Sequence, residues 1–284
     1  MKGKQYLLTA VAVLSLIALF VFGKIDTQKS TFSHKDASVI SFNITDYIQN
    51  AKGKLSISQQ EFLNKKENSI KRGDINIQQV HEYETLATFW KDSTMLLPPY
   101  LYYLAESAKL DNSEKNLTFA ARLILDSMRV EENVPLKSWE AETAVSLFKK
   151  AIEIDPNNVD LKVDLGSCYV YGKGMIGDAT ETMKGIQQLL QVVRNDSANM
   201  KAQMVLGIGG VISRQFPKAV ERLEKVVKSQ PGNLEAVSWL ADAYAGKGDK
   251  GPAIKWYEYS KKLVNDKKYS KEVDDRIKAL NSEH

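Results

Sequence analysis

The chain has 284 residues, of which 43% are hydrophobic and 26% are charged, values typical of a folded globular protein. Its single cysteine excludes an intramolecular disulfide and a cysteine-based zinc or iron–sulfur centre, and its three histidines lie far apart in sequence. The net charge of +4 is mild, whereas nucleic-acid-binding proteins concentrate basic residues on one face. We therefore expect no metal site and no nucleic-acid partner.

The first predicted element is a membrane anchor over residues 1–24. Residues 5–23 carry no charge, and a helix of this length spans about 28 Å, close to the ~30 Å hydrocarbon core of a bilayer. Lys2 and Lys4 precede the apolar run, so the positive-inside rule keeps the N-terminus in the cytoplasm. The pattern predicts a single-pass protein of the bacterial inner membrane, in contact with lipid through residues 5–23, with its C-terminal domain in the periplasm.

The alternative is a cleaved signal peptide that leaves a soluble periplasmic protein. The only candidate cleavage site, Val21-Phe22-Gly23, is poor beside an Ala-x-Ala site, and the apolar run exceeds the usual length of about 7–15 residues. These two features favour an uncleaved signal anchor. Residues 25–43 are polar and aperiodic, and they indicate a tether between the membrane and a folded domain.

Residues 44–113 form a helical N-terminal region. The spacing of apolar residues predicts helices over 58–72, 75–92 and 98–110, followed by a fourth helix over 114–129. Ser58-Gln-Gln-Glu61 matches a capping box at the start of the first of these helices. No run of alternating strand pattern is found, so the folded part is predicted to be all-α.

A 34-residue repeat is the strongest signal in the C-terminal half. The pairs Leu206-Gly207 and Leu240-Ala241 are 34 residues apart, as are Ala219 and Ala253. A third copy begins upstream at Leu165-Gly166-x2-Tyr169, 41 residues before Leu206, so it carries about seven extra residues, placed around 172–182. A further second-helix pattern upstream is Ala144-x3-Phe148, followed by Pro156.

On these motifs the chain resembles the tetratricopeptide repeat (TPR) family, as a bacterial membrane-anchored member. The resemblance implies an all-α, TPR-like α-solenoid of antiparallel helix pairs. Its units would be 114–157, 158–199, 200–233 and 234–267, closed by a capping helix over 268–281. The chain departs from the family pattern where Trp is expected, at Lys162, Gln203 and Val237, and Gly210 replaces a Tyr.

The resemblance also implies a groove that is lined by the first helix of each pair and binds segments of other proteins. The groove positions would be Val163, Ser167, Lys201, Met204, Ile208, Ser238 and Asp242. Some family members grip a C-terminal carboxylate with Lys and Asn, but Val163 and Ser167 stand where those residues are wanted. We expect a membrane-tethered interaction adaptor or assembly factor rather than an enzyme. The alternatives are a self-associating, homo-oligomeric envelope protein and an enzyme built on a helical scaffold.

Three further motifs have simple structural interpretations. Gly172-Lys-Gly174-Met-Ile-Gly177 matches a dinucleotide-binding pattern, but no strand precedes it, so we expect a loop between helices and no cofactor. Gly207-Ile-Gly209-Gly210 lies inside a predicted helix, where glycine is unfavourable unless a helix or a partner backbone approaches closely. Cys168 has no neighbouring His or cationic group in the sequence to activate its thiol, and a buried structural role is expected.

Overall fold

The computed structural model describes residues 42–71, 76–264 and 266–282, which belong to one unit, Ser41–His284. The predicted anchor and residues 25–41 of the predicted tether lie outside the described residues. The described part is helical and contains no strand, so the all-α prediction is confirmed. None of its helices combines the length and the apolar character that crossing a bilayer requires.

The helices follow one another with short connections. In chain order they are α2 (Ile44–Lys52), α3 (Ile57–Lys71), α4 (Asn76–Thr94), α5 (Leu97–Asp111), α6 (Glu114–Val130), α7 (Val134–Ile154), α8 (Val159–Cys168), the π-helix η1 (Tyr169–Gly174), α9 (Ala179–Asn195), α10 (Met200–Ile212), α11 (Phe216–Ser229), α12 (Leu234–Lys247), α13 (Lys250–Leu263) and α14 (Lys267–Ser282).

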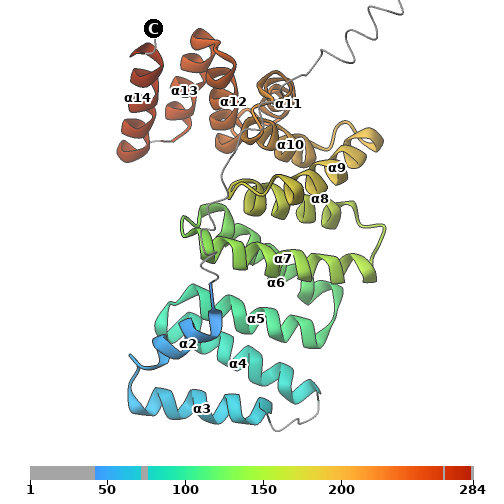
Figure 1. The fold of residues 1–284 in the computed structure, drawn as a ribbon, viewed down its shortest axis with the longest axis vertical. Helices are drawn as coiled ribbons and strands as arrows, with labels where there is room; N and C mark the ends of the chain where they lie inside the picture. The colour runs from blue at the N-terminus through green and yellow to red at the C-terminus, as the bar shows by residue number, and fades with distance from the viewer. Residues whose placement is uncertain (1–41, 72–75, 265, 283–284) are drawn as a thin grey trace, which may run out of the picture. The chain divides into compact units, whose positions relative to one another are not determined.

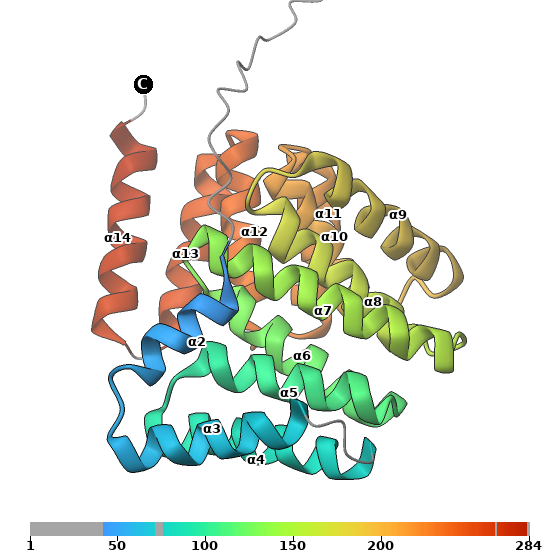
Figure 2. The same ribbon diagram turned by 60° about the horizontal axis from the view of Figure 1, so that its bottom comes forward.

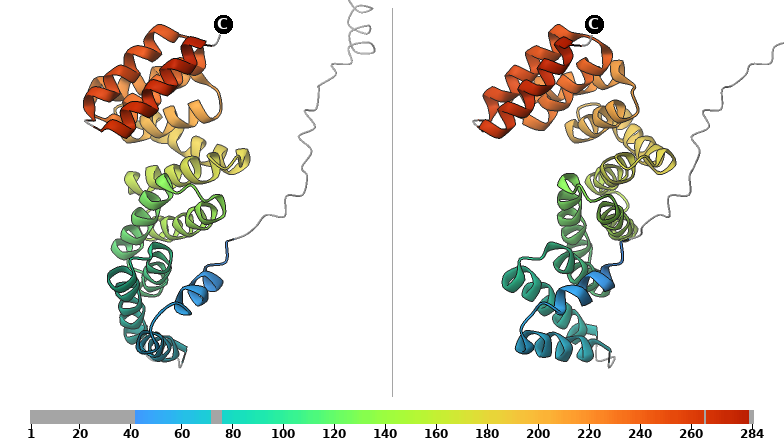
Figure 3. Two further views of the ribbon diagram at one scale, coloured as in Figure 1. Left: turned by 90° about the vertical axis from the view of Figure 1, so that its left-hand side faces the viewer. Right: turned by 60° about the vertical axis from the view of Figure 1, so that its left-hand side comes forward.

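These helices pack as consecutive pairs: α4 with α5, α6 with α7, α8 with α9, α10 with α11, and α12 with α13. Figures 1 and 3 show the pairs stacked one after another between α3 and α14. The pair α4/α5 precedes the four predicted from the repeat. A single pair cannot bury its apolar face, and the neighbouring pairs in the stack bury it.

The same turn opens three successive first helices. Asn158, Asn199 and Asn233 each accept a hydrogen bond from the backbone N–H three residues ahead, at 3.3, 3.0 and 3.0 Å. An Asn side chain in this position satisfies a donor that the helix leaves free. The three caps are 41 and 34 residues apart, which is the register of the sequence repeat.

The two helices of a pair approach closely where a glycine of the first faces a leucine of the second. A Cβ on Gly166 would lie 2.6 Å from Leu189 Cγ, and a Cβ on Gly207 would lie 2.6 Å from Leu223 Cγ. Glycine therefore allows a separation that any side chain would prevent. Gly207 of α10 thus serves helix packing, and the approach of a partner backbone to the glycine run stays a prediction.

The extra residues of the third copy form η1 and the turn that follows it. A Cβ on Gly172 would lie 2.5 Å from Ala141 Cβ of α7, so the π-helix packs tightly on the preceding pair. Gly177 has a φ of +89°, a conformation that glycine adopts at no steric cost. The glycine run is therefore a structural connection, in a helical context unlike that of a dinucleotide site.

The N-terminal part of the unit differs in two details from the sequence prediction. The capping box of α3 is Ser56 with Gln59, not Ser58 with Glu61: Gln59 N donates to Ser56 Oγ at 3.3 Å, and Ser56 N donates to Gln59 Oε1 at 3.0 Å. The fold also begins before Ile44, because the Phe42 ring lies 5.8 Å from that of Trp139 on α7. Figure 2 shows α2 crossing α5, against which it packs.

The last helix, α14, packs its apolar stripe against the α12/α13 pair. Val273 is buried with Ala253 and Tyr257, and Ile277 and Leu280 pack around them. The opposite surface of α14 is exposed and rich in charge. Such a polar outer face is what a terminal cap of a repeat array requires.

Candidate functional site

The first helices α6, α8 and α10, together with η1, line a cavity of about 270 Å³. No second helix contributes to it, so it belongs to the inner face that the first helices share, here called the first-helix face. Its lining residues are Arg122, Leu125, Asp126, Arg129, Asp164, Ser167, Tyr171, Lys201, Met204 and Val205.

Asp164 is the centre of this face. Its side chain is only 1% exposed, and it pairs with one cation from each neighbouring repeat. Arg122 Nε of α6 donates to Oδ2 at 2.7 Å, and Lys201 Nζ of α10 donates to Oδ1. The side chains of Arg122 and Lys201 are 47% and 52% exposed. A buried carboxylate therefore fixes two cations that still face water.

A second network lies beside the first. The Arg129 guanidinium of α6 sits 4.8 Å from the centre of the Tyr171 ring, and it pairs with Glu235 of α12. Tyr171 donates its hydroxyl hydrogen to Glu235 Oε1 at 2.9 Å. Burial, followed by the negative charge of Glu235, raises the pKa of Tyr171 well above its usual value. The hydroxyl is therefore a stable hydrogen-bond donor at physiological pH.

Three of the predicted groove residues, Ser167, Lys201 and Met204, line the cavity. Val163 and Ile208 have no exposed surface and pack in the core, and Ser167 donates its hydroxyl hydrogen to the Val163 carbonyl at 2.8 Å. Val163 and Ile208 therefore lie under the first-helix face and do not reach its surface. Their part in binding stays a prediction.

The remaining two predicted residues contact the capping region. Ser238 and Tyr269 of α14 share a hydroxyl–hydroxyl hydrogen bond at 2.8 Å. Asp242 accepts hydrogen bonds from Arg276 of α14, at 2.9 and 3.2 Å, and from Tyr257 of α13. Their polar atoms are engaged within the fold, so the C-terminal part of the predicted groove is occupied by α14.

The family resemblance did not identify Arg122, Arg129, Asp164, Tyr171 or Glu235. A signal was present in α6, where positions 122, 126 and 129 are charged at a spacing that places them on one helical face. Because α6 lacks the small and large residues of the repeat motif, the motif does not indicate that this polar face lines a groove. The packing of α6 beside α8 and α10 places its cations at the site.

The Cys168 thiol does not reach this face. Cys168 is fully buried, and burial, followed by the charge of Asp164, raises the pKa of its thiol well above the usual value. Within the described ranges, no three His, Cys, Asp or Glu side chains are grouped to hold a metal ion. The first-helix face offers hydrogen-bond donors and acceptors instead.

Helix pairs that recur after 41 and 34 residues, two of them closed by a glycine against a leucine, indicate the type of repeat. These pairs resemble tetratricopeptide repeats. The chain matches no known protein-family profile and no curated protein. Among solved structures, it is similar to YrrB, described as a TPR protein with an unusual peptide-binding site, at 16% identity over 74% of this chain and 97% of that chain, with a TM-score of 0.44.

Two MamA structures are similar to the chain to the same degree. One is at 18% identity over 65% of this chain and 91% of that chain, with a TM-score of 0.44. The other, residues 41 to the end of MamA from Desulfovibrio magneticus RS-1, is at 18% identity over 65% and 94%, with a TM-score of 0.45. The assignment to TPR-like repeats rests on the helix pairs of this chain and not on these scores.

Proposed function

We propose that the protein is a membrane-tethered interaction scaffold whose first-helix face binds an extended segment of a partner protein on the periplasmic side. The observation that carries this proposal is the exposure of Arg122 and Lys201 around a buried Asp164. The tether and its compartment are supported by the sequence of residues 1–24.

The arrangement suits a peptide better than a small molecule. Arg122 and Lys201 hold fixed positions, and they keep donors free for the carbonyl and carboxylate oxygens of a bound segment. The cavity of about 270 Å³ is smaller than the pockets of roughly 300–1,000 Å³ that enclose small ligands. It accommodates part of a chain that continues along the face, and we propose no catalytic activity for it.

Site-specific photo-cross-linking in the full chain tests this proposal. A photoreactive apolar residue at position 126 or 204, on the first-helix face, should give one defined adduct in intact cells. The same residue at Lys149, an exposed position on the second helix α7, should not give it. Equal adducts at all three positions, or none at 126 and 204, would remove the support for this face. An adduct with a second copy of the chain would favour self-association.

Charge reversal provides the matching functional test. Lys201→Glu should abolish the adduct formed at position 126, whereas Lys149→Glu should leave it unchanged, because both lysines are exposed but only one lies on the face. Met204→Glu, in the cavity wall, should act like Lys201→Glu. Ile208 is unsuitable for this test because a charge in its fully buried position would report on folding.

The membrane part of the proposal has its own test. Alkaline phosphatase fused after the last residue should be active in cells, because that enzyme gains activity only on the periplasmic side. The intact mass of the membrane-bound chain should include residues 1–23. An inactive fusion would overturn the orientation, and a chain that starts after Gly23 would favour the cleaved signal peptide.

A further inference from the structure

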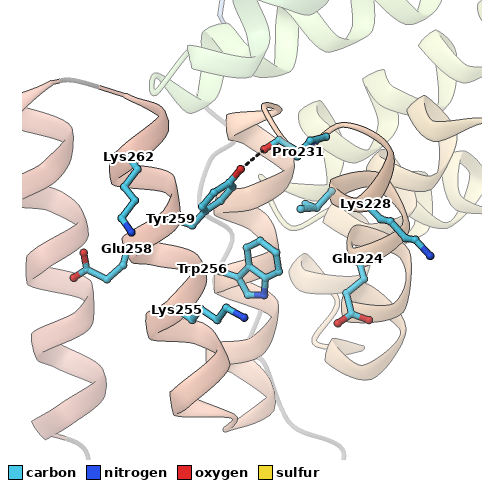
Figure 4. A pocket seen from close by; sticks show the side chains of 9 residues that line it. Glu224, Lys228, Pro231, Lys255, Trp256, Glu258, Tyr259 and Lys262 are labelled. Carbon is cyan, nitrogen blue, oxygen red and sulfur yellow. Dashed lines mark hydrogen bonds between the residues drawn. The ribbon is translucent and has the colours of Figure 1, made fainter.

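A larger cleft lies between two second helices, away from the first-helix face. Residues of α11 and α13 line it, and its volume is about 730 Å³ (Figure 4). Its floor is formed by Val227, Trp256 and Tyr259. The two aromatic rings meet edge to face at 5.8 Å and 84°, and Tyr259 donates its hydroxyl hydrogen to the Pro231 carbonyl at 3.3 Å. The floor is thus an ordered aromatic surface.

The charges around this floor are not balanced. Lys228, Lys255 and Lys262 are exposed at the rim, and within the described part of the chain none of them has a hydrogen-bond or ion-pair partner. Of the two acidic lining residues, Glu258 pairs with Lys261 at 3.3 Å, whereas Glu224 accepts the hydroxyl hydrogen of the neutral Tyr244 and keeps its charge. Three unpaired lysines against one carboxylate without a cation leave the cleft with an excess of positive charge.

We propose that this cleft binds an acidic peptide segment that places one large apolar side chain over Trp256. The aromatic floor provides the apolar contact, and the three free lysines provide the complementary charge that selects an acidic segment. The volume lies within the range of pockets that enclose a bulky group. This site is independent of the first-helix face, so the protein presents two binding surfaces on opposite members of its helix pairs.

Fluorescence anisotropy with the full chain in detergent tests the proposal. The probe is a fluorescein-labelled peptide with a central Phe flanked by Asp residues. Two matched peptides replace every Asp by Asn or the Phe by Ala. We expect the acidic Phe peptide to bind at least about tenfold more tightly than either matched peptide, and we expect added salt to weaken its binding.

Three variants in the cleft and one control outside it assign the binding to the cleft. Lys255→Glu combined with Lys262→Glu should weaken binding of the acidic Phe peptide about tenfold or more, whereas Lys115→Glu, an exposed lysine of α6, should not change it. Trp256→Ala should remove the preference for Phe over Ala in the peptide while leaving the preference for Asp over Asn. Circular dichroism melting checks each variant, and Lys255→Gln with Lys262→Gln provides a milder pair that should act in the same direction.

Several outcomes would overturn the proposal. One is equal binding of the acidic and neutral peptides, and another is equal binding by the lysine variant and the parent chain. A dimer in sedimentation velocity that the lysine variant disperses, without any peptide binding, would make a second copy the occupant. Tighter binding of the short-chain anionic lipid dihexanoylphosphatidylglycerol at the same lysines would make a lipid headgroup the occupant.

Discussion

Glu140 of α7 should make the stability of the fold depend on pH. Its side chain is 1% exposed, Ser127 Oγ donates to its Oε1 at 2.6 Å, and its Oε2 has no partner among the described residues. Burial raises the pKa of this carboxyl to about 7; the Ser127 hydrogen bond opposes the rise, Glu131 adds to it, and Lys137 opposes it. The folded protein therefore favours the protonated form.

The sign and the size of the pH dependence follow from the raised pKa of Glu140. The folded state binds the proton more tightly than the unfolded chain, whose Glu titrates near pH 4.5. The stabilisation is therefore fully present below about pH 4.5 and is lost as the pH rises through about 7. Between about pH 5 and pH 8, the free energy of unfolding should fall by about 2.5 kcal/mol through this group alone.

Urea denaturation of the parent chain and of Glu140→Gln at both pH values measures the effect. The neutral amide replaces the protonated carboxyl, so the free energy of unfolding of the variant should fall much less between the two pH values. The variant should therefore be more stable than the parent at the higher pH. Glu153→Gln, at an exposed position of the same helix, should keep the parent's pH dependence. If Glu140→Gln shows the same decline as the parent, Glu140 is ionised in the fold and the reasoning fails.

Two further sets of substitutions test the contacts between repeats and the packing within a helix pair. Arg122→Ala and Lys201→Ala should each lower the free energy of unfolding by about 1 kcal/mol or less, because both side chains are half exposed and the other cation still pairs with Asp164. The double variant should lower it by about 3–5 kcal/mol, because it leaves that carboxylate buried and unpaired. Additive costs in chemical denaturation would contradict a shared carboxylate. Gly166→Ala should destabilise by about 1–3 kcal/mol, because its Cβ would lie 2.6 Å from a leucine side chain of α9. A Cβ on Gly251 of α13 would meet open space, so Gly251→Ala should leave the free energy of unfolding unchanged or raise it. If Gly166→Ala and Gly251→Ala change the free energy of unfolding equally, the packing argument is refuted.

The sequence predicts the repeat array because its packing depends on residue size at fixed positions. Gly166 and Gly207 mark where two helices meet closely, and their register gives the order of the pairs. The pair α4/α5 was not predicted as a repeat because it lacks the small and large residues of the motif. The sequence offers two capping boxes for α3, Ser56 with Gln59 and Ser58 with Glu61, at the same spacing, and only the structure shows that the first of them forms.

The candidate site was less predictable than the fold. A repeat motif indicates which helix lines a groove, but the rotation of each helix decides which side chains reach its surface. Val163 and Ile208 turn into the core, whereas Asp164, one residue along from Val163, meets cations from both neighbouring repeats. Pairs such as Arg129 with Glu235 join residues more than a hundred positions apart, and no local pattern in one sequence reveals them.

The link between Arg129 and Glu235 also bears on how the array comes apart. In a solenoid each repeat ordinarily touches only its neighbours, so repeats can open one at a time from an end. Arg129 and Glu235 tie α6 directly to α12, with the pairs α8/α9 and α10/α11 between them in the chain. Opening the repeats that lie between them also breaks this ion pair, which couples non-adjacent repeats by about 1 kcal/mol or less because both side chains are partly exposed.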